Sequence, residues 1–172
     1  MSKGKVAILV ENDYQDQEVW VPLYRLQEEG YETVVVGTGA AEYKSKYGYP
    51  IRAGVRASDA RSDDFLGVVI PGGWAPDRLR QNAGVLKLVR ELFEKGRVVA
   101  SICHGGWVLA SAGVARGRRL TAYQAIKDDM VHAGAEFLDQ EVVRDGNLIT
   151  SRKPDDLPAF CREILNALKE VS

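Results

Sequence analysis

Short apolar runs recur along the chain and predict the strands of a sheet. Runs rich in Val, Ile and Leu, without regular polar positions, are typical of strands that are covered on both faces. Such runs occupy residues 5–10, 33–36, 65–70 and 97–102. A further short strand is expected at 119–122, and Asp145-Gly146 is a turn signal that predicts a hairpin between 141–144 and 148–151.

The segments between these runs have apolar side chains at helical spacing and predict the helices. They lie at residues 16–29, 84–95, 105–111, 126–133 and 154–170. The stretch 43–55 is rich in Gly and Tyr and is expected to form a hairpin or a loop excursion. Strands that alternate with helices indicate βαβ units. The pattern therefore predicts one α/β domain over residues 1–172, a three-layer sandwich with a mostly parallel sheet.

Composition and charge narrow the function classes. The chain of 172 residues carries 23 Lys+Arg and 24 Asp+Glu, a net charge of −1 at pH 7. This balance argues against a nucleic-acid partner. The chain lacks an apolar stretch of about 18 residues and the apolar region of a signal peptide, so we expect no membrane span and a cytoplasmic location. The two histidines lack ligand spacing, which argues against a metal site.

The most informative segment is the strand that leads into Cys103 and His104, because glycines and a helix follow at once. This order is typical of a nucleophile elbow, a sharp strand-to-helix turn that presents a reactive side chain. The start of the helix is expected to lower the pKa of the Cys103 thiol. Cys103 is therefore the candidate nucleophile and His104 the candidate base. Cys161 is expected to be a free core thiol on the apolar face of the last helix.

Two carboxylates follow strands and are expected to reach the same end of the sheet as Cys103. Asp77 is a candidate to orient His104, and its alternative role is to cap a short helix. Glu18 is expected to have a raised pKa beside the thiol, and its alternative is a solvated first-turn residue. The backbone N–H groups of Gly72-Gly73 and His104 are candidates for an oxyanion hole.

Four blocks of the chain resemble the PfpI branch of the ThiJ/PfpI superfamily. They read PGG-x-APD at 71–77, ASICHG at 100–105, AGV-x-RGR at 112–118 and TSR-x-P-x-DL at 150–157. They occur in the order of the family, and the resemblance covers nearly the whole chain. The resemblance implies a flavodoxin-like sandwich of the class I glutamine amidotransferase-like type, and a homo-oligomer that uses no cofactor.

The resemblance also implies roles for individual residues. Cys103 is the nucleophile, His104 is its partner, and Glu18 is the carboxyl that contacts the sulfur. Asp77 matches an acid that a neighbouring subunit supplies to orient the histidine. Gly73 and His104 match the amides of the oxyanion hole. The implied site therefore draws on residues of two subunits.

The sequence departs from the family pattern at two places near the expected pocket. Tyr123, Trp107 and Gly105 are expected to line it, with Tyr123 at a position that the family uses in this way. The elbow continues with Gly106-Trp107 where the family usually has Pro and a polar residue, so Trp107 is expected to narrow or reshape the pocket. Gln15 stands where some relatives carry a second acidic residue, which leaves one main carboxyl near the thiol.

These observations predict a cofactor-independent cysteine enzyme. The family's activities include intracellular peptidase, glyoxalase and deglycase repair of glycated proteins in stress survival. A small carbonyl or glycated substrate is favoured, because no separate peptide-recognition domain is present. An intracellular cysteine peptidase is one alternative, and a redox-sensing thiol protein or chaperone is the alternative from a different class. A class I amidotransferase is disfavoured, because no acid stands two residues after His132.

Overall fold

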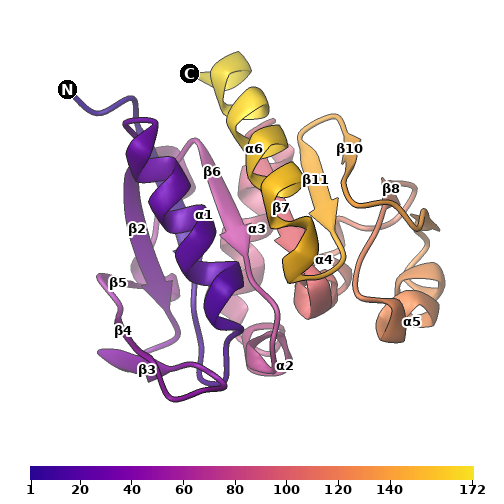
Figure 1. Ribbon diagram of the computed structural model, residues 1–172, viewed down its shortest axis with the longest axis horizontal. Helices are drawn as coiled ribbons and strands as arrows, with labels where there is room; N and C mark the ends of the chain where they lie inside the picture. The colour runs from indigo at the N-terminus through magenta and orange to yellow at the C-terminus, as the bar shows by residue number, and fades with distance from the viewer.

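The computed structural model describes residues 1–172 and contains a seven-stranded central sheet (Figure 1). In spatial order its strands are β10 (Val143–Asp145), β11 (Leu148–Ser151), β7 (Val98–Ile102), β6 (Gly67–Ile70), β1 (Lys5–Leu9), β2 (Glu32–Gly37) and β5 (Val55–Arg56). Every neighbouring pair is parallel except β10 and β11, which form the predicted hairpin. The prediction of a mostly parallel α/β sheet is confirmed.

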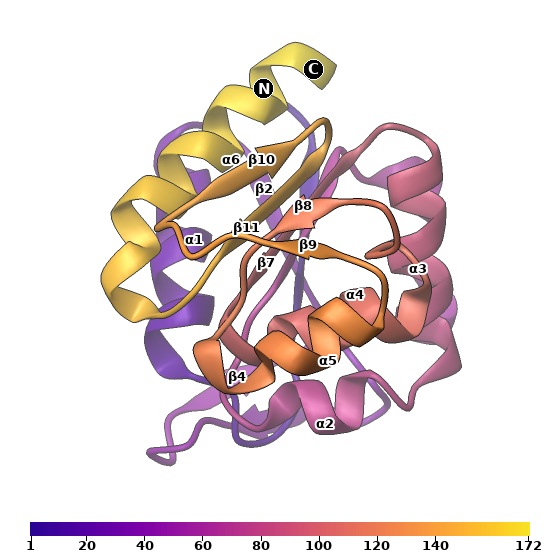
Figure 2. The same cartoon turned by 90° about the vertical axis from the view of Figure 1, so that its right-hand side faces the viewer.

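Helices cover both faces of this sheet, as Figures 1 and 2 show. α1 (Asp16–Glu28) and α6 (Leu157–Val171) pack together on one face. α3 (Ala83–Glu94) and α4 (Gly106–Ala112) pack together on the other. The buried residues of α3 are Val85, Leu88, Val89 and Leu92. This spacing places one apolar stripe against the sheet and explains why the segment forms a helix there.

Several small elements lie outside the main layers. β3 (Glu42–Lys44) and β4 (Pro50–Arg52) form a hairpin, which agrees with the excursion expected at 43–55. α5 (Lys127–His132) agrees with the helix expected at 126–133. α2 (Ala75–Leu79) is the short helix that the alternative role of Asp77 assumed, although five residues are too few to show a helical period.

The strand expected at 119–122 is shorter in the structure and lies outside the central sheet. β8 (Arg119–Leu120) pairs with β9 (Glu136–Phe137) in a separate parallel pair. Thr121 does not extend β8, because its backbone N–H donates to Thr150 Oγ1 at 2.9 Å. A side-chain acceptor on β11 therefore replaces the next ladder bond.

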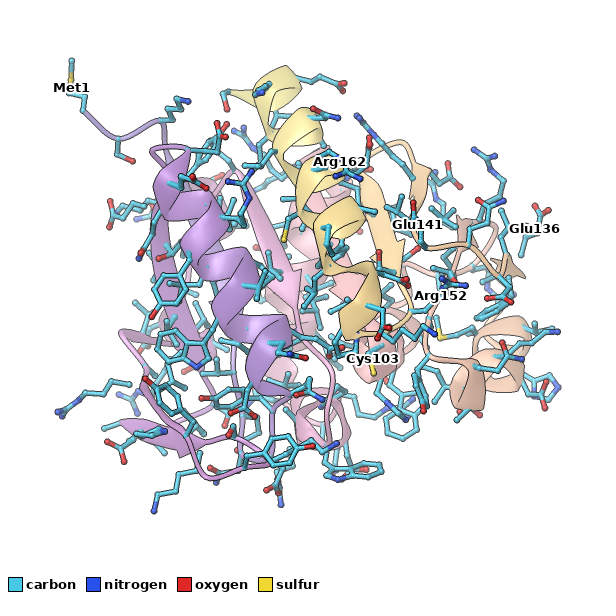
Figure 3. All side chains as sticks on the ribbon, viewed as in Figure 1. Met1, Cys103, Glu136, Glu141, Arg152 and Arg162 are labelled. Carbon is cyan, nitrogen blue, oxygen red and sulfur yellow. The ribbon has the colours of Figure 1, made fainter.

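The centre of the sheet is dry, and its carboxyl end carries the loops of interest. Every residue of β6 and β7 is buried, as expected for parallel strands between two helical layers. The chain leaves both strands at the same end, and Figure 3 labels Cys103 there, below the strands. Loops from two neighbouring strands therefore meet at one edge.

None of the helices combines the length and the apolar composition that crossing a membrane requires.

Candidate active site

Cys103 occupies the strand-to-helix turn that the sequence predicts. β7 ends at Ile102, residues 103–105 form one 3₁₀ turn, and α4 follows directly. The Cys103 backbone has a φ of 61°, a left-handed conformation that costs a non-glycine residue roughly 1–2 kcal/mol. A Cβ at Gly105 would lie 2.8 Å from the Ile70 carbonyl oxygen, so only glycine fits this turn without a shift. The turn therefore projects the Cys103 side chain beyond the end of the sheet.

His104 is a direct polar partner of the Cys103 sulfur. Its Nδ1 lies 3.3 Å from Sγ. The imidazole stacks on Tyr123 with ring centroids 4.8 Å apart, and it meets Trp74 and Trp107 at 5.6 and 5.3 Å. Burial lowers the pKa of His104. The imidazole is therefore neutral at pH 7 and can accept the thiol proton at Nδ1.

Glu18 lies in the first turn of α1 and is fully buried, so it is not the solvated residue of the alternative prediction. Its Oε1 accepts a hydrogen bond of 2.9 Å from the Gly72 N–H. A Cβ at Gly72 would lie 2.6 Å from this Oε1 and 3.0 Å from the Cys103 sulfur. The carboxyl and the sulfur therefore approach the same glycine. Burial raises the pKa of Glu18 to about 7, against the hydrogen bonds with Gly72 and Cys103.

The pKa of the Cys103 thiol shifts in the opposite direction to the sequence prediction. Burial, followed by the charge of the Glu18 carboxylate, raises this pKa to about 12. The backbone N–H groups of His104 and Gly73 lower it, as a helix start should, but they contribute less than burial. The prediction that the helix alone favours the thiolate is wrong. Protonation of Glu18 removes the like charge and so favours ionisation of the sulfur, while burial continues to raise the pKa of the thiol.

The Gly73 and His104 amides lie where an oxyanion hole would be needed, because both are near enough to the sulfur to lower the pKa of the Cys103 thiol. Gly73 has a φ of 76°, and a Cβ there would lie 2.5 Å from the Asp13 carbonyl oxygen. Only glycine allows this approach, which an isolated bridge between Tyr14 and Gly73 fixes. The two N–H groups are thus positioned by the backbone alone and need no side chain.

Asp77 is not brought to His104 within one chain. It lies exposed in the first turn of α2, where Trp74 and not Asp77 occupies the cap position. Its side chain forms no hydrogen bond, and the His104 ring bonds only to the Cys103 sulfur. The alternative role as a helix cap is therefore wrong. The role across a subunit interface stays a prediction.

A cavity of about 380 Å³ opens onto the sulfur. It is lined by Gln15, Lys46, Gly73, Trp74, Cys103, His104, Tyr123, Ala125 and Pro154. Tyr123 lines it as expected, and so does Gln15. Lys46 and Trp74 were missed: Lys46 belongs to the β3–β4 excursion, and no local pattern shows that this excursion returns to the sheet end. For Trp74, the sequence signal of a place in the site was its position directly after two glycines in a strand-end loop. The structure shows that its side chain is exposed.

Trp107 and Gly105 do not line this cavity, so that part of the prediction is wrong. Gly105 is buried under the Ile70 backbone and serves the turn. The Trp107 indole N–H donates to Asp129 Oδ2 at 2.9 Å, and the Arg80 guanidinium lies 5.4 Å from its ring. These contacts hold Trp107 outside the cavity lining, with its ring in edge contact with the imidazole of His104.

A buried thiol, a neutral imidazole, a carboxyl that titrates near neutrality and two backbone N–H groups converge on this cavity. Such a set can generate a thiolate, add it to a carbonyl carbon and hold the resulting oxyanion.

Comparisons with known proteins agree with this arrangement. Residues 4–167 match the model of the DJ-1/PfpI family. The chain is 43% identical over 165 residues to "Deglycase PH1704" of Pyrococcus horikoshii, which covers 96% of this chain and 99% of that protein. It is 39% identical to "Putative cysteine protease YraA" of Bacillus subtilis, over 98% of this chain and 100% of that protein.

A solved structure shows the same fold. The crystal structure of a two-domain protein from Anabaena variabilis, with DJ-1/ThiJ/PfpI-like and ferritin-like domains, has a TM-score of 0.95 and 43% identity over 97% of this chain. The present chain spans about half of that protein, 48% of its length. The family model, the relatives of similar length and this structure all lead to one conclusion: the chain belongs to the DJ-1/PfpI family.

Proposed function

We propose that this protein is a cofactor-independent cysteine enzyme that acts on small reactive carbonyl compounds or their glycation adducts, as a deglycase or glyoxalase. The observation that carries the proposal is the Cys103 sulfur facing a small cavity, 3.3 Å from the His104 Nδ1 and beside the buried Glu18. The 43% identity to a protein named as a deglycase supports the same activity. The proposed activity removes toxic carbonyl compounds under stress.

The first chemical step is the addition of sulfur to an aldehyde carbon. His104 Nδ1 takes the thiol proton, a C–S bond forms, and the carbonyl π electrons move onto oxygen. The Gly73 and His104 backbone N–H groups hold that oxyanion. His104 then returns the proton to oxygen, and the product is a hemithioacetal.

For a 2-oxoaldehyde, a glyoxalase reaction completes the cycle. His104 removes the hydrogen of the former aldehyde carbon as a proton, which gives an enediol. Protonation of the adjacent carbon and transfer of the hydroxyl proton to the adjacent oxygen then give a thioester, which water hydrolyses. The products are a 2-hydroxy acid and the free thiol, so no external oxidant or reductant is consumed. Glu18 in its protonated form stabilises the thiolate before it adds to the aldehyde and after hydrolysis releases it.

Turnover of methylglyoxal to lactate by purified variants tests the proposal. Cys103→Ser should lower kcat/KM by a factor of at least about 1,000, because the nucleophile is lost. Cys161→Ser is the matched control and should retain activity, since Cys161 is packed in α6. Undiminished turnover by Cys103→Ser would exclude Cys103 from the reaction.

A cysteine peptidase is the second candidate, and the relative in B. subtilis favours it by name. The same two variants with a fluorogenic peptide separate the candidates. Peptide cleavage that depends on Cys103, without methylglyoxal turnover, would establish the peptidase. A redox-sensing thiol protein is the remaining alternative, and it needs the same Cys103 thiolate as the enzyme.

The acid that orients His104 is proposed to come from a neighbouring copy of the chain in a homo-oligomer. Asp77 is exposed and unpaired, and His104 lacks an acidic partner within its own chain. Asp77→Asn and Cys103→Ser should each be inactive alone. Mixed and reassembled, they should regain activity, because some sites then combine an intact Cys103 with an intact Asp77. Failure to regain activity from stable mixed oligomers would place the acid elsewhere.

A further inference from the structure

Lys46 holds a fixed place beside the cavity. It follows β3, and its backbone N–H donates to the Tyr14 carbonyl oxygen at 2.9 Å. Tyr14 also bridges to Ser45 and Gly73, so one short segment ties the excursion to the loop that carries the Gly73 N–H. Ser45 Oγ donates to Asp16 Oδ2 at 2.7 Å. The backbone of Lys46 is therefore anchored to the start of α1 although its side chain is exposed.

The Lys46 ammonium is the only formal charge on the cavity lining, because His104 is neutral and the other lining residues carry no charge. Its side chain lies over the Trp74 ring, with Nζ 5.5 Å from the centroid. It belongs to none of the salt bridges of the chain, whereas Arg78 nearby is paired with Asp13 at 3.0 Å. A cation–π contact at an exposed site contributes about 0.5–1 kcal/mol and leaves the ammonium N–H groups available.

The electrostatic influence of Lys46 reaches across the cavity. Its charge lowers the pKa of Glu18, Cys103 and His104 alike. An unpaired cation that acts on all three groups of the site also acts on any anion bound between them. Gln15, whose side chain is neutral, lines the same cavity and adds amide donors.

We propose that Lys46, together with the Gln15 amide, binds the carboxylate of the substrate, so that this site prefers carbonyl compounds that carry a carboxylate. The proposal deepens the proposed function by naming its substrate class. One ammonium and one amide match the two oxygens of a carboxylate. A phosphate group fits less well, because the cavity lining holds no arginine and the two N–H groups at the sulfur are needed for the oxyanion. A carbonyl on the Cys103 sulfur and a carboxylate on Lys46 would occupy the cavity together.

Alkylation of Cys103 tests the charge preference without any turnover. Iodoacetate and iodoacetamide have nearly the same shape and differ by one negative charge, and peptide mass spectrometry separates Cys103 from Cys161. Lys46→Met should lower the ratio of the iodoacetate rate to the iodoacetamide rate about 1.5-fold to fivefold, the range for an exposed ion pair. Lys44→Met, a neighbouring exposed lysine outside the cavity, should leave the ratio unchanged.

The ratio separates recognition from thiol ionisation. A change in the pKa of Cys103 alters both rates by the same factor and cancels. An unchanged ratio in Lys46→Met would therefore overturn the proposal, even if both reagents reacted more slowly. The ratio of the unmodified protein should also fall towards that of Lys46→Met at an ionic strength of about 1 M, because salt screens an exposed charge.

A second test compares the turnover of two substrates whose carbon chains have equal length. 4,5-Dioxovalerate is a 2-oxoaldehyde with a terminal carboxylate, and 2-oxopentanal has a methyl group in its place. Lys46→Met should lower kcat/KM for the first about fivefold more than for the second, because a change in the pKa of Cys103 affects both substrates by the same factor. Equal loss on both would refute carboxylate binding. If the unmodified protein turned over neither compound, the proposed function would fail, while the alkylation ratio would still decide the role of Lys46.

Discussion

The two cysteines lie in regions that bury sulfur to nearly the same degree, yet only one region is equipped for chemistry. Cys103 is 7% exposed and Cys161 is 4% exposed. Burial raises the pKa of Cys103 to about 12 and that of Cys161 to about 11. Exposure and thiol acidity therefore do not distinguish them.

The groups around each sulfur make the difference. Cys161 lies in the middle of α6, in a dry environment that includes Pro22, Leu26 and Leu165. Cys103 lies at a strand end, where an imidazole, a carboxyl and two N–H groups meet. A buried thiol becomes a candidate nucleophile when its neighbours can remove its proton and hold its charge. This difference between the two cysteines can be tested by changing the neighbours of Cys103 one at a time.

The largest expected effect concerns Glu18, the carboxyl that lies beside Cys103 and has no counterpart beside Cys161. The folded-state pKa of Glu18 is about 7 and its ordinary value is 4.5, so the folded state binds more protons between these values. The contribution of Glu18 to stability is therefore most favourable below about pH 4.5 and becomes less favourable, by about 3 kcal/mol, as the pH rises to about 7. Urea unfolding should show this fall in the unmodified protein relative to Glu18→Gln, whose amide does not titrate.

Glu18→Gln should also speed the alkylation of Cys103 at neutral pH, because removal of the carboxylate charge lowers the pKa of the thiol. The rate at Cys161 should not change. Slower alkylation at Cys103 would show that Glu18 chiefly stabilises the thiolate as a hydrogen-bond donor.

A smaller effect is expected when Glu18 and Cys103 are pushed apart while both side chains remain in place. A Cβ at Gly72 would lie 2.6 Å from Glu18 Oε1 and 2.7 Å from Cys103 Cβ, so Gly72→Ala must push these groups apart. A misplacement of about 1 Å can cost about a hundredfold in kcat/KM, or about 2.7 kcal/mol. Gly54→Ala is the control, because its nearest contact would be an ordinary 3.7 Å. Equal activity in both variants would mean that the close packing at Gly72 is unimportant.

The smallest expected effect is on stability, and it depends on the backbone conformation at the two cysteines. Cys103 has a φ of 61°, whereas Cys161 lies in the helical α6. Glycine should therefore be more stable than alanine at position 103, by about 1 kcal/mol, and less stable than alanine at position 161 by a similar amount. Thermal unfolding of the four single variants measures this reversal. The same order at both positions would show that residue 103 is not strained in the folded protein.

Local patterns predicted much of the fold. The strands β1, β6 and β7 are continuous apolar runs, and the helices α1, α3 and α6 are long enough to show their helical period. The elements that were missed or misplaced, such as β8 and β9, are only two residues long. Their position depends on partners that lie far away in the sequence, as the Thr150 hydroxyl that ends β8 illustrates.

Within the site, the sequence by itself determined the turn at Cys103, because an apolar strand followed by Cys, His and Gly encodes a sharp strand-to-helix junction in consecutive residues. Only the tertiary structure decided the sign of the thiol pKa shift, the exclusion of Trp107 from the cavity and the inclusion of Lys46. The physical reason is that desolvation and charge act through space. They depend on everything packed around a group, and neighbours in the folded protein need not be neighbours in the chain.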